Sequence, residues 1–301
     1  MKQIDILLRA SVQKKLNPLT DLPWNDAPSK DLFWMPEKLI SIYGEPEYEC
    51  LCDEKKLELS QLEFSLLCSV SSSGEKEVIA NMATRMLKTK YRAFRRYFYH
   101  FIEEENNHIY MFTEFCERYG EYFPVLYPYV QGDIWDYTET GDLLTFAHVL
   151  IFEELGQGLN EVMAEDEAIP ELVRAINDYH VQDEGRHISF GRSLVREFAG
   201  VTKSIVTKEE WSRLQRFVKE YISTRHNDYH NVKIYKTVGI KNALDLRSRL
   251  IEQRDESFFI KSPLAARRIK SLREFLIEID MLSVEDDSVI QTEFKELQGV
   301  M

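Results

Sequence analysis

Two copies of one short pattern, an acidic residue followed three positions later by a histidine, are the feature of this chain that most clearly predicts chemistry. Glu105 is paired with His108 in this way, and Glu184 with His187. Residues three positions apart lie on one face of a helix, so each pair would direct a carboxylate and an imidazole to the same point. Two such helices, each beside a second helix that offers one more Glu, make a cage for two metal ions inside a four-helix bundle.

The residues around both pairs support this interpretation better than the spacing alone. With 51 acidic residues and 7 histidines in 301 residues, about one such match is expected by chance. Apolar residues recur at helical spacing around the first pair, including Phe101 and Phe112, and around the second pair, including Ile176 and Phe190. Ionised carboxylates are rarely buried without a partner, because desolvation is costly, and a metal ion is the natural partner.

The acid expected from the first long helix has two candidates. Glu75 shares an apolar face with Val78, whereas Glu77 shares its face with Asn81. We predict Glu75 as the ligand and keep Glu77 as the alternative. The distance of Glu75 from the turn near residue 90 also matches that of Glu105, as an antiparallel helix pair requires.

The acid expected from the third helix also has two candidates. Glu153 follows Phe146 and Val149 on an apolar face, whereas Glu154 shares its face with a second acid, Glu161, which suggests contact with water. We predict Glu153 as the ligand and keep Glu154 as the alternative.

A third histidine extends the second pair. His180 lies four residues before Glu184 and seven before His187, so all three share one stripe of a helix. A lone histidine in such a position is more often a hydrogen-bonded core residue. Beside two other ligands, His180 is predicted to be a seventh ligand that gives one metal an extra nitrogen.

The residues next to the motif acids predict a second layer of contacts. Metal-bound imidazoles usually donate their second N–H to a carboxylate. We therefore expect Asp183 to orient His108 and Glu104 to orient His187 across the bundle. The simpler alternative is that both are solvated acids, an interpretation that fits Glu104 better than Asp183. Arg186 would close a buried ion pair in the same layer.

Composition and charge restrict the classes of partner. The chain is 44% hydrophobic and carries a formal net charge of −13, which disfavours nucleic acid and anionic membrane surfaces. Its 4 cysteines show neither zinc-site nor disulfide spacing, which favours a reducing, cytoplasmic location. The sequence contains no recognisable secretion signal and no apolar run long enough to span a membrane.

Helical periodicity dominates the chain and predicts an all-α fold. We expect an irregular N-terminal arm over residues 1–54, a diiron four-helix bundle over 55–200, and C-terminal helices packed on the bundle over 201–301, in a single domain. The bundle helices are expected at 55–88, 92–119, 142–164 and 171–198, with a long connection at 120–140 and further amphipathic stretches at 208–225, 232–254 and 264–280.

The C-terminal stretches contain few residues that suggest chemistry. Tyr235, Arg247 and Arg249 could line the mouth of a pocket, but a helix packed on the bundle with solvated arginines is the favoured interpretation. His226 and His230 lie four residues apart without an apolar face, so we predict that they are surface residues.

The order of these motifs resembles that of a known group of enzymes. A helical Glu, then ExxH, then another helical Glu, then HxxxExxH is similar to the pattern of the ferritin-like diiron oxygenases. The added His180, the segment DEGRH at 183–187, and the segments FWMPE at 33–37 and YGEP at 43–46 resemble the p-aminobenzoate N-oxygenase family of arylamine N-oxygenases. The resemblance extends over residues 30–285.

The resemblance implies a ferritin-like bundle that holds two iron ions, with manganese as a substitute, and uses O2 as co-substrate. It implies an N-oxygenase that oxidises an amine to a hydroxylamine, nitroso or nitro product in natural-product biosynthesis. Glu105 and Glu184 would bridge the metals, and His180 would influence the reaction with O2.

Other functions compete with this one. The main alternative is a diiron hydroxylase or desaturase that acts on carbon of a small or carrier-bound substrate. Iron storage or ferroxidase activity is disfavoured by the chain length and by His180, and a metal-free structural bundle is the remaining possibility. The expected partner is a small-molecule amine, while the electron donor (a reductase or ferredoxin), a carrier protein and a homodimer are left open.

Overall fold

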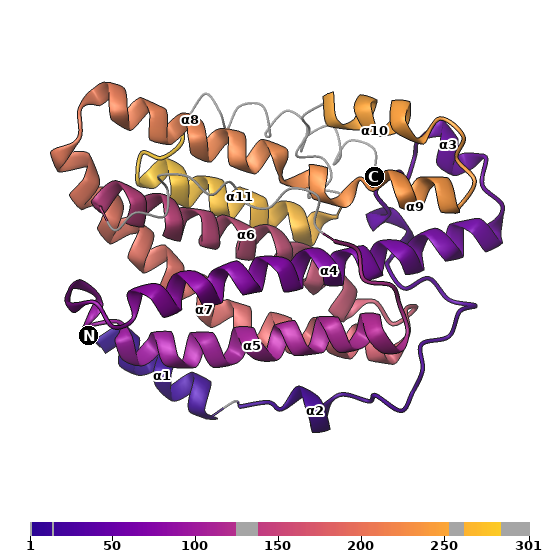
Figure 1. Ribbon diagram of the computed structural model, residues 1–301, viewed down its shortest axis with the longest axis horizontal. Helices are drawn as coiled ribbons and strands as arrows, with labels where there is room; N and C mark the ends of the chain where they lie inside the picture. The colour runs from indigo at the N-terminus through magenta and orange to yellow at the C-terminus, as the bar shows by residue number, and fades with distance from the viewer. Residues whose placement is uncertain (1, 14, 125–137, 253–261, 284–301) are drawn as a thin grey trace.

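The computed structural model describes residues 2–13, 15–124, 138–252 and 262–283, and every regular element within them is a helix. Four long helices run along the long axis of the molecule (Figure 1). They are α4 (Asp53–Arg85), α5 (Arg95–Arg118), α6 (Glu139–Glu165) and α7 (Glu171–Ile205). The all-α, four-helix architecture predicted from the sequence is confirmed, although α7 continues beyond its predicted end at residue 198.

Short connections join the four helices into two hairpins. The 3-10 helix η2 (Thr89–Tyr91) lies between α4 and α5, and residues 166–170 connect α6 to α7. Helices joined in this way become antiparallel neighbours, and α4 packs along α5 as α6 packs along α7. The two hairpins then pack against each other as in a ferritin-like bundle. Most of the connection predicted over 120–140 lies outside the described residues.

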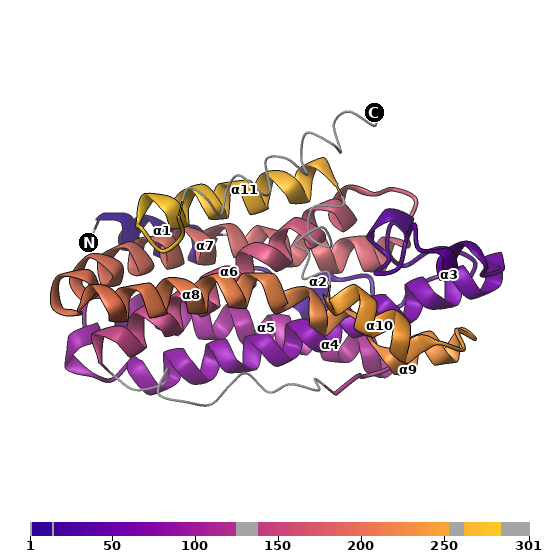
Figure 2. The same ribbon diagram turned by 90° about the horizontal axis from the view of Figure 1, so that it is seen from above.

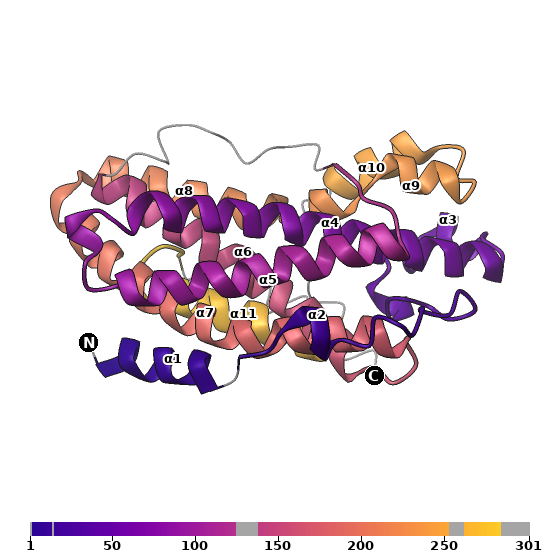
Figure 3. The ribbon, with the colours of Figure 1, turned by 60° about the horizontal axis from the view of Figure 1, so that its bottom comes forward.

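The N-terminal arm contains a helix in a region predicted from the sequence to be irregular. The arm comprises α1 (Lys2–Gln13), α2 (Pro18–Asp21), η1 (Glu37–Leu39) and α3 (Pro46–Glu49). Figure 3 shows α1 and α2 lying along α5. Leu7, Leu8 and Ser11 are buried on one face of α1, where it meets α5 and α7. The prediction is wrong for α1 because tertiary packing stabilises a helix too short to persist alone.

The C-terminal part packs against both hairpins. It forms α8 (Lys208–Thr224), η4 (Arg225–Tyr229), α9 (Val232–Thr237), α10 (Ala243–Glu252) and α11 (Pro263–Glu278). Both α8 and α11 pack against α6 (Figure 2). The stretch predicted over 232–254 is divided because Gly239 adopts a φ of 97° and ends α9. In the described part of the chain, no helix combines the length and apolarity needed to cross a membrane.

A buried ion network ties the end of α4 to the start of α6. Oδ1 of Asp142 accepts hydrogen bonds from Nε of Arg85, at 3.0 Å, and from the hydroxyl of Tyr91. Its Oδ2 lies 2.6 Å from Nζ of Lys90. Arg85 is 1% exposed and also donates to the hydroxyl of Thr145. The network therefore fixes the two hairpins to each other.

Replacing the carboxylate at the centre of this network should destabilise the fold. In the variant Asp142→Ala, Arg85 loses its buried counter-charge, and we expect the free energy of unfolding to fall by about 3–5 kcal/mol. Urea denaturation followed by circular dichroism measures this change. Glu103→Ala, which breaks an exposed pair with Lys15, should unfold like the wild type. Equal midpoints for the two variants would contradict the role given to Asp142.

Candidate metal centre

Each of the four bundle helices brings one glutamate to a common level. Glu75 lies on α4, Glu105 on α5, Glu153 on α6 and Glu184 on α7, and each is at most 2% exposed. The hairpin geometry explains their level, because Glu75 lies 14 positions before the start of η2 and Glu105 lies 14 positions after its end. The antiparallel pairs therefore direct their acids into one interior region.

Three histidines lie among these carboxylates. Oε1 of Glu184 is 3.3 Å from Nδ1 of both His108 and His187. It is also 3.3 Å from Nε2 of His180. The carboxylate of Glu105 contacts the same two Nδ1 atoms, at 3.0 Å for His108 and 2.8 Å for His187. Two carboxylates thus each face at least two imidazoles.

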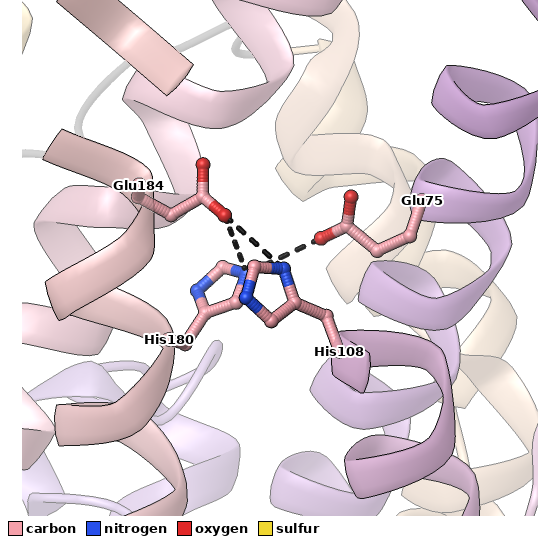
Figure 4. Close-up of side chains that lie close together, drawn as sticks. All are labelled: Glu75, His108, His180 and Glu184. Carbon is pink, nitrogen blue, oxygen red and sulfur yellow. Dashed lines mark hydrogen bonds and ion pairs between the residues drawn. The ribbon is translucent and has the colours of Figure 1, made fainter. Parts of the chain in front are cut away.

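The seven side chains form overlapping groups of donors. Glu75, His108, His180 and Glu184 place one donor atom each within 4.8 Å of one another, and Figure 4 shows them converging from opposite sides of the bundle. Glu105, His108, Glu184 and His187 form a second such group, and Glu75, Glu105 and Glu153 a third. Because the two four-residue groups share His108 and Glu184, the arrangement offers two adjacent positions for a cation.

The structure distinguishes the candidate acids on α4 and α6. Glu75 faces the cluster, whereas the side chain of Glu77 is 30% exposed and pairs with a neighbouring lysine. Glu153 faces the cluster as well. The expectation that Glu154 contacts water is wrong, because Arg192 donates two hydrogen bonds to its carboxylate, at 2.5 and 2.8 Å, and the residue is fully buried.

Many polar atoms of the cluster lack hydrogen-bond partners among the described residues. Both oxygens of Glu153 and of Glu184 are buried without a hydrogen bond of normal geometry, although Oε1 of Glu184 lies 3.3 Å from three ring nitrogens. The same holds for one oxygen of Glu75, and for Oε1 of Glu105 and Nδ1 of His187, which face each other as an ion pair at 2.8 Å. Buried polar atoms are seldom left unsatisfied, so a concentration of them indicates a site built for a ligand. Four carboxylates would balance two divalent cations, and carboxylate with imidazole suits iron or manganese.

Burial and neighbouring charges shift the pKa values of the four carboxyls in opposite directions. Burial, reinforced by the charge of Glu105, raises the pKa of Glu75. Burial and the charge of Glu184 raise the pKa of Glu153. Burial also acts on Glu105 and Glu184, but the positive charge of His187 helps to lower the pKa of both. The surroundings therefore favour the neutral form of Glu75 and Glu153 and the ionised form of Glu105 and Glu184.

The pKa values of the three imidazoles also diverge. Burial lowers the pKa of His180 to about 4, so this ring is neutral. Burial disfavours the charged form of His108 too, but hydrogen bonds to Asp183 and Glu105 outweigh it and raise the pKa to about 10. The charge of Glu105 likewise raises the pKa of His187 against burial. Protonated imidazoles thus balance the ionised carboxylates, as bound cations would.

A second layer of contacts holds the outer nitrogens of two histidines. Nε2 of His108 lies 3.2 Å from Oδ2 of Asp183, and Nε2 of His187 lies 2.8 Å from Oε2 of Glu104. Arg186 donates Nη2 to Glu104 at 2.7 Å and also to Asp183. The structure therefore brings together the pairs that the sequence suggested, with the guanidinium between the two carboxylates.

Two further side chains near the cluster were not predicted. Nδ2 of Asn160 lies 2.6 Å from Nδ1 of His180, and Oγ of Ser11 accepts a hydrogen bond from Nε of Arg186 at 3.1 Å. Asn160 follows Glu153 by seven residues, a helical spacing that could have identified it. No local pattern connects Ser11 on α1 with Arg186 on α7.

The residues singled out in the C-terminal stretches lie elsewhere. His226 and His230, predicted to be at the surface, are only 2% and 4% exposed, and Nδ1 of His230 lies 2.9 Å from the hydroxyl of buried Tyr235. That prediction is wrong because neighbouring segments cover both rings. Arg247 donates to the backbone carbonyl of His230, and Arg249 pairs with two glutamates of the arm. These contacts agree with a helix packed on the bundle.

Fold and cluster together define a class of protein, a four-helix bundle with a buried carboxylate and histidine centre suited to two metal ions. The model of the p-aminobenzoate N-oxygenase AurF family matches residues 1–242, and the chain belongs to this family. AurF, for which the family is named, is a diiron oxygenase that uses O2. The match includes the N-terminal arm, whereas the resemblance noted in the sequence begins at residue 30.

Other relatives are more distant. Uncharacterized proteins of Mycobacterium bovis and Mycobacterium tuberculosis are 24% identical over 214 residues, which are 65% of this chain and 61% of theirs, so the chain spans less than two thirds of their length. Variants of an R2-like ligand-binding oxidase have related structures. One with an Mn/Fe cofactor has a TM-score of 0.48, 16% identity and 94% coverage of both chains. One with an Fe/Fe cofactor has a TM-score of 0.46, 16% identity, and coverage of 87% of this chain and 92% of that chain.

Removing the charge that faces His108 should weaken metal binding. In the variant Asp183→Asn, the outer nitrogen of His108 loses its carboxylate partner, and we expect ferrous affinity to fall by roughly 10–100-fold. Anaerobic titration with ferrous ion measures this affinity. The matched control is Asp178→Asn, which changes an exposed acid of the same helix that bonds to Gln182. Identical affinities for the two variants would show that Asp183 does not support the site.

Proposed function

We propose that this protein is an O2-dependent non-haem diiron N-oxygenase that oxidises an amine to a hydroxylamine, nitroso or nitro product in natural-product biosynthesis. The observation that carries the proposal is the family match over residues 1–242, because that family is described as p-aminobenzoate N-oxygenase. The buried donor cluster supports it, since its charge and composition fit two iron ions.

We assign seven residues as metal ligands. Glu75, His108 and His180 would hold one iron, Glu153 and His187 would hold the other, and Glu105 and Glu184 would be shared between them. Glu75, His108, His180 and Glu184 form one donor group, Glu184 lies among all three imidazoles, and Glu105 contacts both His108 and His187. The placement of Glu153 beside His187 is part of the proposal. Manganese has the same preference for carboxylate and imidazole, and it would serve as a substitute.

The bound irons would supply the activation of O2, and the residues of the chain would orient and shield them. Asp183 and Glu104 each accept the outer N–H of a histidine, which leaves the inner nitrogen free to bind metal. The ring of Phe101 lies 4.0 Å from that of His187, so an aromatic side chain excludes water from this side of the site.

His180 is the residue to which we assign control of oxygenation. It would give one iron a second imidazole nitrogen beside that of His108, whereas the other iron would have only His187. An additional nitrogen occupies a coordination position and changes the electronic properties of the metal that it binds. The role is therefore distinct from simple retention of iron.

The proposal also includes partners. The substrate would be a small-molecule amine, and because reduction of O2 consumes electrons, a separate donor such as a reductase or ferredoxin would supply them. Oxidation at carbon, the main alternative, is an outcome that the experiments below distinguish by the position of the added oxygen.

The metal content of matched variants tests the foundation of this proposal. Wild-type protein should bind two ferrous ions per chain in anaerobic titration. Glu75→Gln should lose one of them, because a buried carboxylate ligand becomes a neutral amide. Glu77→Gln, two positions away on the same helix, should bind two. A wild type that binds far fewer than two ions, or equal loss in both variants, would rule out the assigned ligands.

Amine-dependent consumption of O2 tests the reaction itself. Chemically reduced protein is supplied with a panel of aryl and alkyl amines and isotopically labelled O2, and mass spectrometry locates the label. We expect label on nitrogen. His180→Ala should retain two irons at saturating ferrous ion but lose turnover by on the order of tenfold or more, as expected for a residue of the metal's immediate surroundings. Label on carbon would refute N-oxygenation, and full activity of His180→Ala would refute the role of His180.

A further inference from the structure

Asn160 makes a contact that distinguishes His180 from the other two histidines of the cluster. Asn160 lies on α6, is 1% exposed, and places Nδ2 2.6 Å from Nδ1 of His180 on α7. The distance is that of a hydrogen bond between two buried groups on different helices. The amide therefore determines how the ring of His180 is held.

The three imidazoles do not present the same nitrogen to the cluster. In His108 and His187, Nδ1 faces the cluster. Nε2 of His108 contacts the carboxylate of Asp183, and Nε2 of His187 contacts that of Glu104. His180 is reversed, with Nε2 at 3.2 Å from Glu75 and Nδ1 turned outward. Its outer nitrogen meets a neutral amide in place of a carboxylate.

The orientation of this amide decides which nitrogen of His180 carries the proton. If Nδ2 donated to Nδ1, the proton of the neutral ring would sit on Nε2, the atom that faces Glu75 and Glu184. If the amide turns over, Nδ1–H donates to Oδ1 of Asn160 and the lone pair of Nε2 faces the cluster. The two orientations differ only by exchange of the amide oxygen and nitrogen, which have nearly the same shape.

An unsatisfied atom favours the second orientation. In the first orientation, Oδ1 of Asn160 is buried and accepts no hydrogen bond from the described residues. Turning the amide gives this oxygen the Nδ1–H of His180 as donor and moves Nδ2 to the place that Oδ1 held. The same change directs the lone pair of Nε2 into the cluster, and a histidine needs such a lone pair to bind a metal ion.

We infer that Asn160 is a positioning residue that holds His180 with its proton on Nδ1 and its Nε2 lone pair directed into the site. A carboxylate partner increases the donor strength of an imidazole more than a neutral amide does. His180 is therefore the weakest nitrogen donor of the three. It shares its metal position with His108, so that position has one stronger and one weaker imidazole. This inference rests on the proposed ligand set. The family match by itself assigns no role to Asn160.

Nuclear magnetic resonance of metal-free protein tests the tautomer without any metal or turnover. Protein labelled with 15N-histidine, with signals assigned by comparison with His180→Ala, should show His180 protonated at Nδ1. Asn160→Leu, which keeps a similar volume but accepts no hydrogen bond, should lose this preference, whereas Asn160→Asp should keep it. A wild-type His180 protonated at Nε2 would overturn the inference, as would an Asn160→Leu spectrum with the wild-type tautomer.

Anaerobic ferrous titration of a double-mutant cycle tests the consequence for the site. Asn160→Leu should weaken one of the two iron sites by about tenfold and leave the other unchanged, whereas Asn160→Asp should bind at least as tightly as the wild type. In a His180→Ala background, Asn160→Leu should cause no further loss. Circular dichroism confirms that each variant is folded.

The outcomes separate this inference from the proposed function. A wild type that binds far fewer than two irons refutes the ligand set, whereas a wild type with two irons and an Asn160→Leu variant of equal affinity refutes only the role of Asn160. A loss that persists undiminished in the His180→Ala background would also refute it, because Asn160 would then act on something other than His180.

Discussion

Four glutamates buried at one level of a helical bundle are the constraint on which the rest of this structure depends. Carboxylates removed from water must be neutralised or paired. Raised pKa values of Glu75 and Glu153 and protonated imidazoles serve that purpose in the cluster described here. Burying such a centre makes the free energy of folding less favourable. The ion network at Asp142 and the helices packed on α6 offset that cost. Stability thus comes from outside the centre, while the centre itself is shaped for cations.

Close packing between the hairpins sets the distance across which the donors meet. Gly74 directly precedes Glu75, and Phe152 directly precedes Glu153. A Cβ at Gly74 would lie 2.1 Å from Cζ of Phe152, so the aromatic ring occupies the space that any larger residue would need. This contact between α4 and α6 stands beside two of the four acids, and side-chain size there controls the separation of the helices that carry them.

Elements outside the bundle complete the surroundings of the site. Ser11 on α1 bonds to Arg186, which in turn holds the carboxylates of Asp183 and Glu104. A cavity of about 180 Å³ beneath α1 is bordered by these same two acids. The arm is therefore connected to the histidines through one arginine, which gives a physical reason for the family match to include it.

The sequence by itself determined the elements and the direction of the donors within each of them. Spacing along one helix placed Glu184 with His180 and His187, and apolar faces favoured Glu75 over Glu77, because side-chain direction follows from helical geometry alone. Only the tertiary structure decided the rest. The folding of α1, the burial of His226 and Glu154, and the contact of Asn160 with His180 each depend on which helices meet, and at what rotation. Periodicity shows which face of a helix is apolar, but the neighbour of that face comes from a distant part of the chain, and no local pattern specifies it.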